Sequence, residues 1–331
     1  MGVSQTADTG PPPAAERIDE VLAEAYERAA RHHEGAVADY IPTLAAADPD
    51  AFGLCVVDVG GGLHEVGSTR TEFSIQSISK AFVYALLCDR LGHERVLEVV
   101  GVNNTGHAFS SVMAVELHDG HPRNPMVNAG AIATTALLPG ATPEERWGLI
   151  QDGLSRFAGR GLEVDDEVYR CESETNHRNR AIAQLLESYG RIEGDPAAAV
   201  DVYTRQCALR VDARDLAVMG ATLADGGVNP VTGDRVVSAE VARDTLAVLA
   251  ASGLYEQSGQ WLFEIGLPGK SGVAGGIVAV APGKGGFGSY APRLDAAGNS
   301  VRGQVAAAYL SRALGLNIFA SSPRPRPRQV P

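Results

Sequence analysis

The hydrophobic pattern of this chain is helical through its middle and strand-like toward both ends. Apolar residues recur at helical spacing over residues 18–33, 143–158, 177–190, 197–208, 213–225, 238–252 and roughly 301–314. Short apolar runs typical of strands lie at residues 52–59, 63–66, 276–281 and 286–291. The glycines at positions 60–62 separate the first two runs, so these two are predicted to form a β-hairpin.

The order of these elements predicts an α/β (α+β) fold. Strands from the two chain ends are expected to form one antiparallel sheet flanked by helices, with a helical region at about residues 77–252 inserted between them. A catalytic cleft would then lie between the sheet and the helical region. We expect one domain over residues 16–316. Residues 1–15 and 317–331 are rich in Pro, or in Pro and Arg, and are predicted to be disordered.

Composition and charge limit the classes of molecule that the protein is expected to bind. The chain has 331 residues, is 45% apolar and carries a net charge of −12, which fits a soluble globular protein and disfavours nucleic acid or an anionic membrane as partner. No apolar run approaches the ~18 residues of a membrane span, and the N-terminus lacks the features of a signal peptide. The four cysteines are scattered, so free thiols in the reducing cytoplasm are expected.

Lysine is scarce, with only three among 28 basic residues, and two of the three stand in motifs. Lys80 ends the sequence Ser77-Ile78-Ser79-Lys80, at a point where a helix from Ser77 to Leu91 is predicted. Helix positions i and i+3 share a face, so Lys80 can reach toward the Ser77 hydroxyl. Its apolar neighbours would lower its pKa and make it a usable base, which an arginine could not be.

A lone serine three residues before a lysine is weak evidence, because an N-cap serine followed by a surface lysine gives the same pattern. The second motif changes this reading. Lys270-Ser271-Gly272 precedes a predicted strand. In SxxK hydrolases of the penicillin-binding and β-lactamase kind, such a tripeptide lies on the strand facing the nucleophile. The two motifs together predict a serine hydrolase.

Three further polar strings lie between these motifs, at residues 124–132, 172–179 and 253–256. Taken alone, Asn128 could be an N-cap, the second string a solvated helix end, and Tyr255 a packed aromatic. Taken in order, they resemble the serine-dependent glutaminase family, from about residue 21 to residue 314. The resemblance is carried by residues 40–42 (Tyr-Ile-Pro), 73–80 (Phe-Ser-Ile-Gln-Ser-Ile-Ser-Lys), 124–132, 172–179, 253–256, 270–276 and 298–300 (Gly-Asn-Ser).

The resemblance implies a β-lactamase-like fold and hydrolysis of L-glutamine to L-glutamate and ammonia through a γ-glutamyl-serine ester. It implies that Ser77 is the nucleophile, Lys80 its base and Tyr255 a second proton-transfer group. The oxyanion hole would consist of the backbone N–H groups of Ser77 and Val273. The remaining residues implied to bind glutamine or line its pocket are Asn128, Glu172, Asn179, Tyr203, Tyr40 and Gln76.

The same resemblance implies no metal or organic cofactor, and a homodimer or tetramer. Lys270 is expected to act electrostatically or structurally near the site, whereas Lys284 is expected to be an ordinary turn residue. Two alternatives stay open at this point. One is another SxxK hydrolase that acts on β-lactams or D-Ala peptides, and the other is an amino-acid sensor that binds without catalysis.

Overall fold

The computed structural model describes residues 10–39, 41–104 and 106–321. The outermost parts of the two ends predicted to be disordered, residues 1–9 and 322–331, lie outside these ranges. The first helix is α1 (Ala15–Ala29). At the other end the N–H of Ile318 donates to the carbonyl of Gly266 at 2.9 Å, so hydrogen bonding to the domain extends past residue 316.

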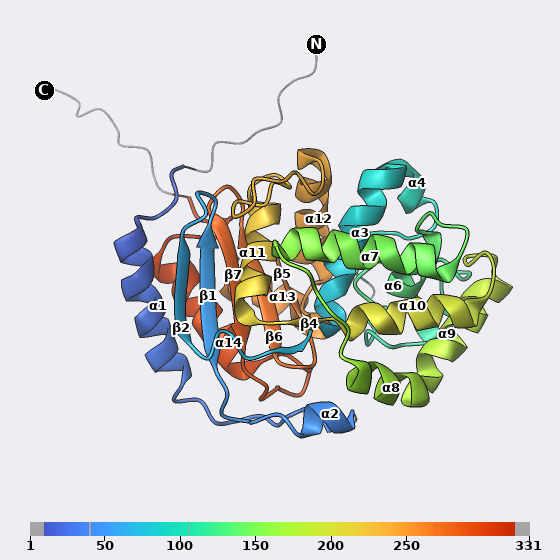
Figure 1. Cartoon of the computed structure of the whole chain (residues 1–331), viewed down its shortest axis with the longest axis horizontal. Coiled ribbons are helices and arrows are strands. Elements are labelled where there is room, and N and C mark those ends of the chain that lie inside the picture. The colour runs from blue at the N-terminus through green and yellow to red at the C-terminus, as the bar shows by residue number, and fades with distance from the viewer. Residues whose placement is uncertain (1–9, 40, 105, 322–331) are drawn as a thin grey trace, which may run out of the picture.

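Strands from the two ends of the chain form one sheet, as predicted (Figure 1). The strand order is β2-β1-β7-β6-β5, and every neighbouring pair is antiparallel. The central pair joins β1 near the N-terminus to β7 near the C-terminus, with Val56 opposite Phe287. The five strands are β1 (Gly53–Asp58), β2 (Leu63–Gly67), β5 (Gly269–Ser271), β6 (Gly276–Ala281) and β7 (Gly285–Tyr290).

Helices cover both faces of this sheet. Helices α1 and α14 (Val301–Ala313) pack on one face, and α11 (Ala213–Ala224) packs on the other. Successive side chains of a strand point to opposite faces, so neighbouring residues of β6 pack into different hydrophobic clusters. Ile277 belongs to the hydrophobic cluster of α1 and α14, whereas Val278 belongs to the larger cluster that includes α11.

Most of the remaining helices form a second region beside the sheet, to the right in Figure 1. The helices predicted at 143–158, 177–190, 197–208, 213–225 and 238–252 are present, with boundaries within two residues of those expected. The helices of this region and its connections are α2 (Pro42–Ala45), α3 (Ser79–Leu91), α4 (His93–Leu97), α5 (Met113–Glu116), α6 (Asn128–Leu137), α7 (Pro143–Ala158), α8 (Asp166–Thr175), α9 (His177–Ser188), α10 (Pro196–Cys207), α12 (Ala239–Ser252) and α13 (Ser258–Glu264). Among the described residues, no helix is long and apolar enough to cross a membrane.

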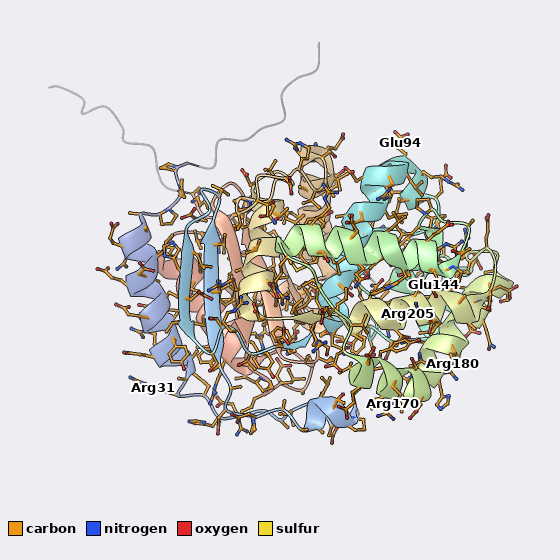
Figure 2. The ribbon with its side chains drawn as sticks, viewed as in Figure 1. Arg31, Glu94, Glu144, Arg170, Arg180 and Arg205 are labelled. Atoms are coloured by element: carbon orange, nitrogen blue, oxygen red, sulfur yellow. The ribbon has the colours of Figure 1, made fainter. Side chains whose placement is uncertain are left out.

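Charged side chains of the helical region cover its outer surface (Figure 2). Arg205 on α10 pairs with Glu144 on α7 at 2.8 Å and with Asp201 one turn earlier at 3.0 Å. Glu144 is 69% exposed, so this contact adds little to stability and fixes the spacing of the two helices at their outer edge.

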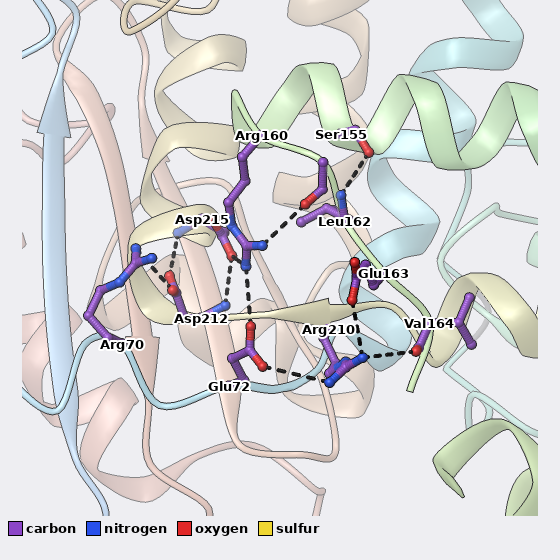
Figure 3. Close-up of polar contacts among 11 residues, drawn as sticks. Arg70, Glu72, Ser155, Arg160, Leu162, Glu163, Val164, Arg210, Asp212 and Asp215 are labelled. Carbon is purple, nitrogen blue, oxygen red and sulfur yellow. Dashed lines mark hydrogen bonds and ion pairs between the residues drawn. The ribbon is translucent and has the colours of Figure 1, made fainter. Parts of the chain in front are cut away.

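A more buried ionic network joins the helical region to the sheet (Figure 3). The guanidinium of Arg160, in the segment after α7, donates to both carboxylate oxygens of Asp215 at 2.8 and 2.6 Å. Asp215 also forms a capping box with Asp212 at the start of α11, and Asp212 pairs with Arg70 at 3.0 Å. Arg160 further contacts Glu72 at 3.8 Å, beside the small sheet of β3 (Phe73–Ser74) and β4 (Arg210–Val211).

Helix α11 lies directly against the backbone of β7. Gly286 and Gly288 face the helix, and a Cβ atom at Gly288 would collide with the carbonyl oxygen of Ala213 and the amide nitrogen of Ala217. The colliding atoms are main chain and cannot rotate away. The close contact between helix and sheet therefore depends on glycine at these positions.

We predict that Gly288→Ala lowers the free energy of unfolding by about 2–3 kcal/mol, because the helix must move away from the sheet. The matched control is Gly148→Ala, at an exposed site of α7 where a Cβ meets no atom within 4 Å. That change should raise the free energy of unfolding by about 0.5–1 kcal/mol through helix propensity. Urea unfolding of both variants checks the pair, and equal effects would contradict the packing argument.

Candidate active site

Ser77 lies on a tight turn between β3 and α3. Residues Gln76–Ile78 form one turn of 3₁₀ helix, and α3 begins at Ser79. The prediction that the helix begins at Ser77 is therefore wrong by two residues. The first turn closes instead with i→i+3 hydrogen bonds, from the N–H of Ile78 to the carbonyl of Ile75 and from that of Ser79 to Gln76. Gln76 itself has φ of +52°, in the left-handed region. Ser77 itself is 9% exposed.

A second left-handed residue lies near this turn. Tyr255 has φ of +54°, and it begins the 3₁₀ turn Tyr255–Gln257. Within the described ranges, Gln76, Tyr255 and Asp119 are the non-glycine residues with positive φ. Such backbone costs of order 1–3 kcal/mol and persists where the surroundings enforce it, most often at functional sites.

Lys80 is buried, with 1% of its surface exposed, which excludes the surface lysine considered from the sequence. Its ammonium donates to Asn128 Oδ1 at 2.7 Å and to the carbonyl of Met126 at 3.5 Å. In the part of the chain that the structure describes, no hydrogen bond joins it to Ser77 and no carboxylate lies within 4 Å of it. Burial lowers the pKa of Lys80 to about 8.

Lys270 and Tyr255 lie together at the edge strand β5. The Lys270 ammonium is fully buried, donates to the carbonyl of Ser271 at 2.8 Å, and lies 4.4 Å from the centre of the Tyr255 ring. The Tyr255 hydroxyl donates to the same carbonyl at 3.2 Å. Burial raises the pKa of Tyr255 to about 12, although hydrogen bonds to Ser77 and Ser271 oppose this shift. Burial also places the pKa of Lys270 well below its usual value, with the Lys80 charge as a smaller cause.

The strand carrying Lys270 faces the turn carrying Ser77, as the tripeptide predicted. A Cβ atom at Gly272 would lie 3.0 Å from the carbonyl oxygen of Ile75 and 3.3 Å from a side-chain carbon of Ile78. The glycine of the Lys-Ser-Gly motif thus lets two backbone segments touch beside Ser77.

A cleft of about 420 Å³ opens beside this arrangement. Seven residues expected at the site line it: Gln76, Ser77, Asn128, Glu172, Asn179, Tyr203 and Val273. Tyr40, also expected there, lies outside the described residues, and its neighbour Ile41 lines the cleft. Tyr255 and Lys80 were expected at the site as well, but they are not among the residues that line the cleft. The other lining residues are Phe109, Ser110, Thr175, Asn176, Arg178 and Cys207.

The polar wall of the cleft combines a carboxylate with amides. Glu172 on α8 is half-buried, and its Oε1 accepts a hydrogen bond from Gln76 at 2.5 Å. Burial raises the pKa of Glu172 to about 7. Asn128, the first residue of α6 rather than its N-cap, accepts from Lys80 and donates to Asn179 Oδ1 at 2.9 Å. A ligand with an ammonium and a carboxylate would find partners here for both groups.

Some lining residues were not predicted. Cys207 ends α10 and Phe109 belongs to an irregular loop, so neither stands in a motif that marks chemistry. Arg178, which donates to Ser110 Oγ at 3.2 Å, lies inside the 172–179 string, and that string was the available signal. The string itself spans the end of α8 and the start of α9; periodicity predicted the start of α9 at residue 177 but not helix α8.

The burial of Lys80 has a cost that stability measurements can detect. The folded-state pKa of about 8 lies below the usual 10.5, so the unfolded chain binds this proton more tightly than the folded chain does. The full penalty is present below pH 8 and is relieved as the pH rises toward 10.5.

We predict that Lys80→Met raises the free energy of unfolding at pH 7. The gain is about 3 kcal/mol, offset by about 1 kcal/mol for the hydrogen bond that Asn128 loses.

Urea unfolding at pH 7 and pH 9.5 checks this expectation, with Lys284→Met as the control that should stay within about 0.5 kcal/mol of the parent at both values. The difference between Lys80→Met and the parent should shrink at pH 9.5. A difference that grows with pH would contradict the sign of the argument.

Comparisons with known proteins show the family of the chain. The family model described as Glutaminase matches residues 35–319. Glutaminase 2 of Yersinia pestis is 53% identical over 322 residues, which are 97% of this chain and 95% of that protein. A glutaminase of Colwellia psychrerythraea is 47% identical over 302 residues, 91% of this chain and 97% of that protein.

Solved structures give the same result. One described as "Probable glutaminase ybaS" has a TM-score of 0.92 at 42% identity and covers 93% of this chain and 100% of its own. "Mglu in its glutamate form" has a TM-score of 0.88 at 42% identity, covering 92% of this chain and 70% of its own. The sheet, the cleft and these matches lead to one conclusion, that the chain belongs to the glutaminase family.

Proposed function

We propose that this protein is a glutaminase that hydrolyses L-glutamine to L-glutamate and ammonia through a γ-glutamyl ester on Ser77. The observation that carries the proposal is the cleft itself. One wall presents the carboxylate of Glu172 and the amides of Asn128 and Asn179. Ser77 lines the same cleft, and the buried Lys80 ammonium donates to Asn128.

The head group of glutamine binds to the polar wall. The Glu172 carboxylate accepts hydrogen bonds from the α-ammonium, which requires its ionised form and therefore strengthens as pH rises through about 7. Asn179 and Tyr203 donate to the α-carboxylate, and Asn128 orients Asn179 by donating to its Oδ1. A site that pairs both charged groups discriminates strongly against analogues that lack one of them.

Acylation begins when the Ser77 hydroxyl attacks the side-chain amide carbon of glutamine. Neutral Lys80, aided by Tyr255, receives the hydroxyl proton as the C–O bond forms. The backbone N–H groups of Ser77 and Val273 bind the oxyanion, a stabilisation of about 3–4 kcal/mol per donor in comparable sites. Because Lys80 and Tyr255 share this proton, they titrate as a pair. Collapse of the intermediate breaks the C–N bond, and ammonia leaves with the returned proton.

Deacylation repeats these steps with water. Water loses a proton to the same basic pair and attacks the γ-glutamyl ester, and the second tetrahedral intermediate occupies the same oxyanion hole. Breaking the ester C–O bond returns the proton to Ser77 and releases glutamate. The low pKa of Lys80, which burial causes, keeps a useful fraction of neutral amine available near neutral pH.

We predict that Ser77→Ala abolishes ammonia release from L-glutamine, a loss of about 10⁴-fold or more, because no acyl-enzyme can form. The assay couples ammonia release from L-glutamine and L-asparagine to a dehydrogenase, and hydrolysis of a β-lactam, which releases no ammonia, is followed in parallel by the absorbance of the ring. Turnover of the β-lactam with none of glutamine would instead support the other SxxK hydrolases, and tight glutamine binding without turnover would support a sensor.

Two lysine-to-arginine variants test whether the lysine must lose its proton or only carry a positive charge. Lys80→Arg keeps a cation that cannot lose its proton and should be inactive, while Lys284→Arg should keep the parental rate. Substantial activity in Lys80→Arg would rule out Lys80 as the base.

We also propose that the protein is a cytoplasmic homodimer or homotetramer. All four cysteines are free thiols, which suits a reducing compartment. Met113 and Leu117, four residues apart, are 56% and 57% exposed and offer an apolar contact for a second copy. Sedimentation velocity should show a species of at least twice the 34.6 kDa chain, and a single 34.6 kDa species at micromolar concentration would overturn this proposal.

A further inference from the structure

Asn299 is a buried asparagine outside the cleft that no step above uses. It lies in the loop between β7 and α14 and is 0% exposed. Its Oδ1 accepts a hydrogen bond from Ser271 Oγ at 2.5 Å, and its Nδ2 donates to Gln257 Oε1 at 3.0 Å. Its own N–H is held by Asp295 Oδ1 at 3.0 Å. The side chain is therefore fixed and joins two other segments.

Those two segments carry the basic and phenolic groups of the site. Ser271 follows Lys270 on β5, and Gln257 ends the 3₁₀ turn that begins at Tyr255. The Ser271 carbonyl accepts from both the Tyr255 hydroxyl and the Lys270 ammonium. A displacement of Ser271 would consequently move the acceptor that orients both groups.

The backbone of Tyr255 requires such support. Its φ of +54° is unfavourable for an aromatic residue and persists only where neighbouring contacts enforce it. The loop containing Asn299 also lies beside Tyr255. A Cβ atom at Gly298 would lie 3.7 Å from both the Tyr255 ring and the Val273 side chain. The same loop thus borders the phenol and the residue assigned to the oxyanion hole.

We infer that Asn299 is a positioning residue for the reaction, which holds Tyr255 and the Lys270–Ser271 strand in the geometry that proton transfer requires. The inference builds on the proposed function of the site. Asn299 is absent from the residues lining the cleft, and the groups that bind the substrate head belong to other segments. Its loss should therefore lower kcat and leave KM nearly unchanged.

Two replacements of similar size separate hydrogen bonding from packing. Asn299→Leu removes both hydrogen bonds and should lower kcat about 30- to 100-fold with KM within about threefold of the parent. Asn299→Asp keeps the acceptor for Ser271 and should retain kcat within about tenfold. Its added carboxylate favours the charged form of the nearby lysines, so the acid limb of the kcat/KM profile should move to higher pH.

The control is another fully buried asparagine with side-chain hydrogen bonds. Asn229 donates to the carbonyls of Arg156 and Phe157 at 2.9 and 3.1 Å, at the end of α7. Asn229→Leu should lower the Tm as Asn299→Leu does but leave kcat within about twofold when assayed below the Tm. If Asn299→Leu does not fold, Ser271→Ala tests the same link, because it removes only the hydroxyl that Asn299 holds, and it should lower kcat about tenfold.

The measurement pairs steady-state turnover of glutamine with the rate at which a fluorophosphonate labels Ser77, followed by intact mass. Parental kcat in Asn299→Leu, or equal losses in Asn299→Leu and Asn299→Asp, would overturn the positioning role while the parent still hydrolyses glutamine. A parent that labels without turning over glutamine would overturn the substrate but not Asn299, provided that Asn299→Leu labels more slowly. A parent that neither labels nor turns over glutamine would overturn the nucleophile and this inference together.

Discussion

The candidate site contains two buried lysines that form no ion pair with any residue in the described part of the chain. Removing an ammonium from water is costly, and the usual compensation is a nearby carboxylate. Lys80 has instead an amide oxygen and a carbonyl, and Lys270 has a carbonyl and an aromatic ring. These neutral partners stabilise the ammonium less than a carboxylate would. The neutral form of each amine is therefore accessible, and it stays accessible only while no carboxylate of the cleft walls comes close to the nitrogen.

Close backbone contacts make this burial possible. Gly272 and Gly276 let β5 and β6 approach the turn of Ser77, and Gly253 lets the end of α12 meet β5. On the other side, α11 lies on the glycines of β7. The contacts at Gly253, Gly272 and Gly276 hold the segment of Lys270 close to the turn of Ser77, where both lysines are buried. The arrangement is rigid because main-chain atoms cannot change rotamer to relieve a collision.

Much of this architecture could be predicted from the sequence because it follows from local pattern. The helix at 143–158 has strong periodicity, an N-cap threonine and Pro at its first position, and its boundaries are as expected. The left-handed Gln76 and helix α8 were not predicted. The conformation of Gln76 depends on contacts with residues distant in sequence, one of which is Glu172. Helix α8 is rich in polar residues and buries only Val168, so its apolar periodicity is weak. The partner of Lys80 was missed because Asn128 is 48 positions away.

The pairing of β1 with β7 has a consequence for how the chain is made. β1 is synthesised more than 220 residues before β7, its central partner in the sheet. During translation the β1–β2 hairpin therefore has an open edge until almost the whole chain has left the ribosome, and exposed edges invite pairing with other chains. Such long-range closure is intrinsically slow. The lysines of the site meet only after that closure, so an incomplete chain would hold Ser77 and Lys80 without the strand that faces them.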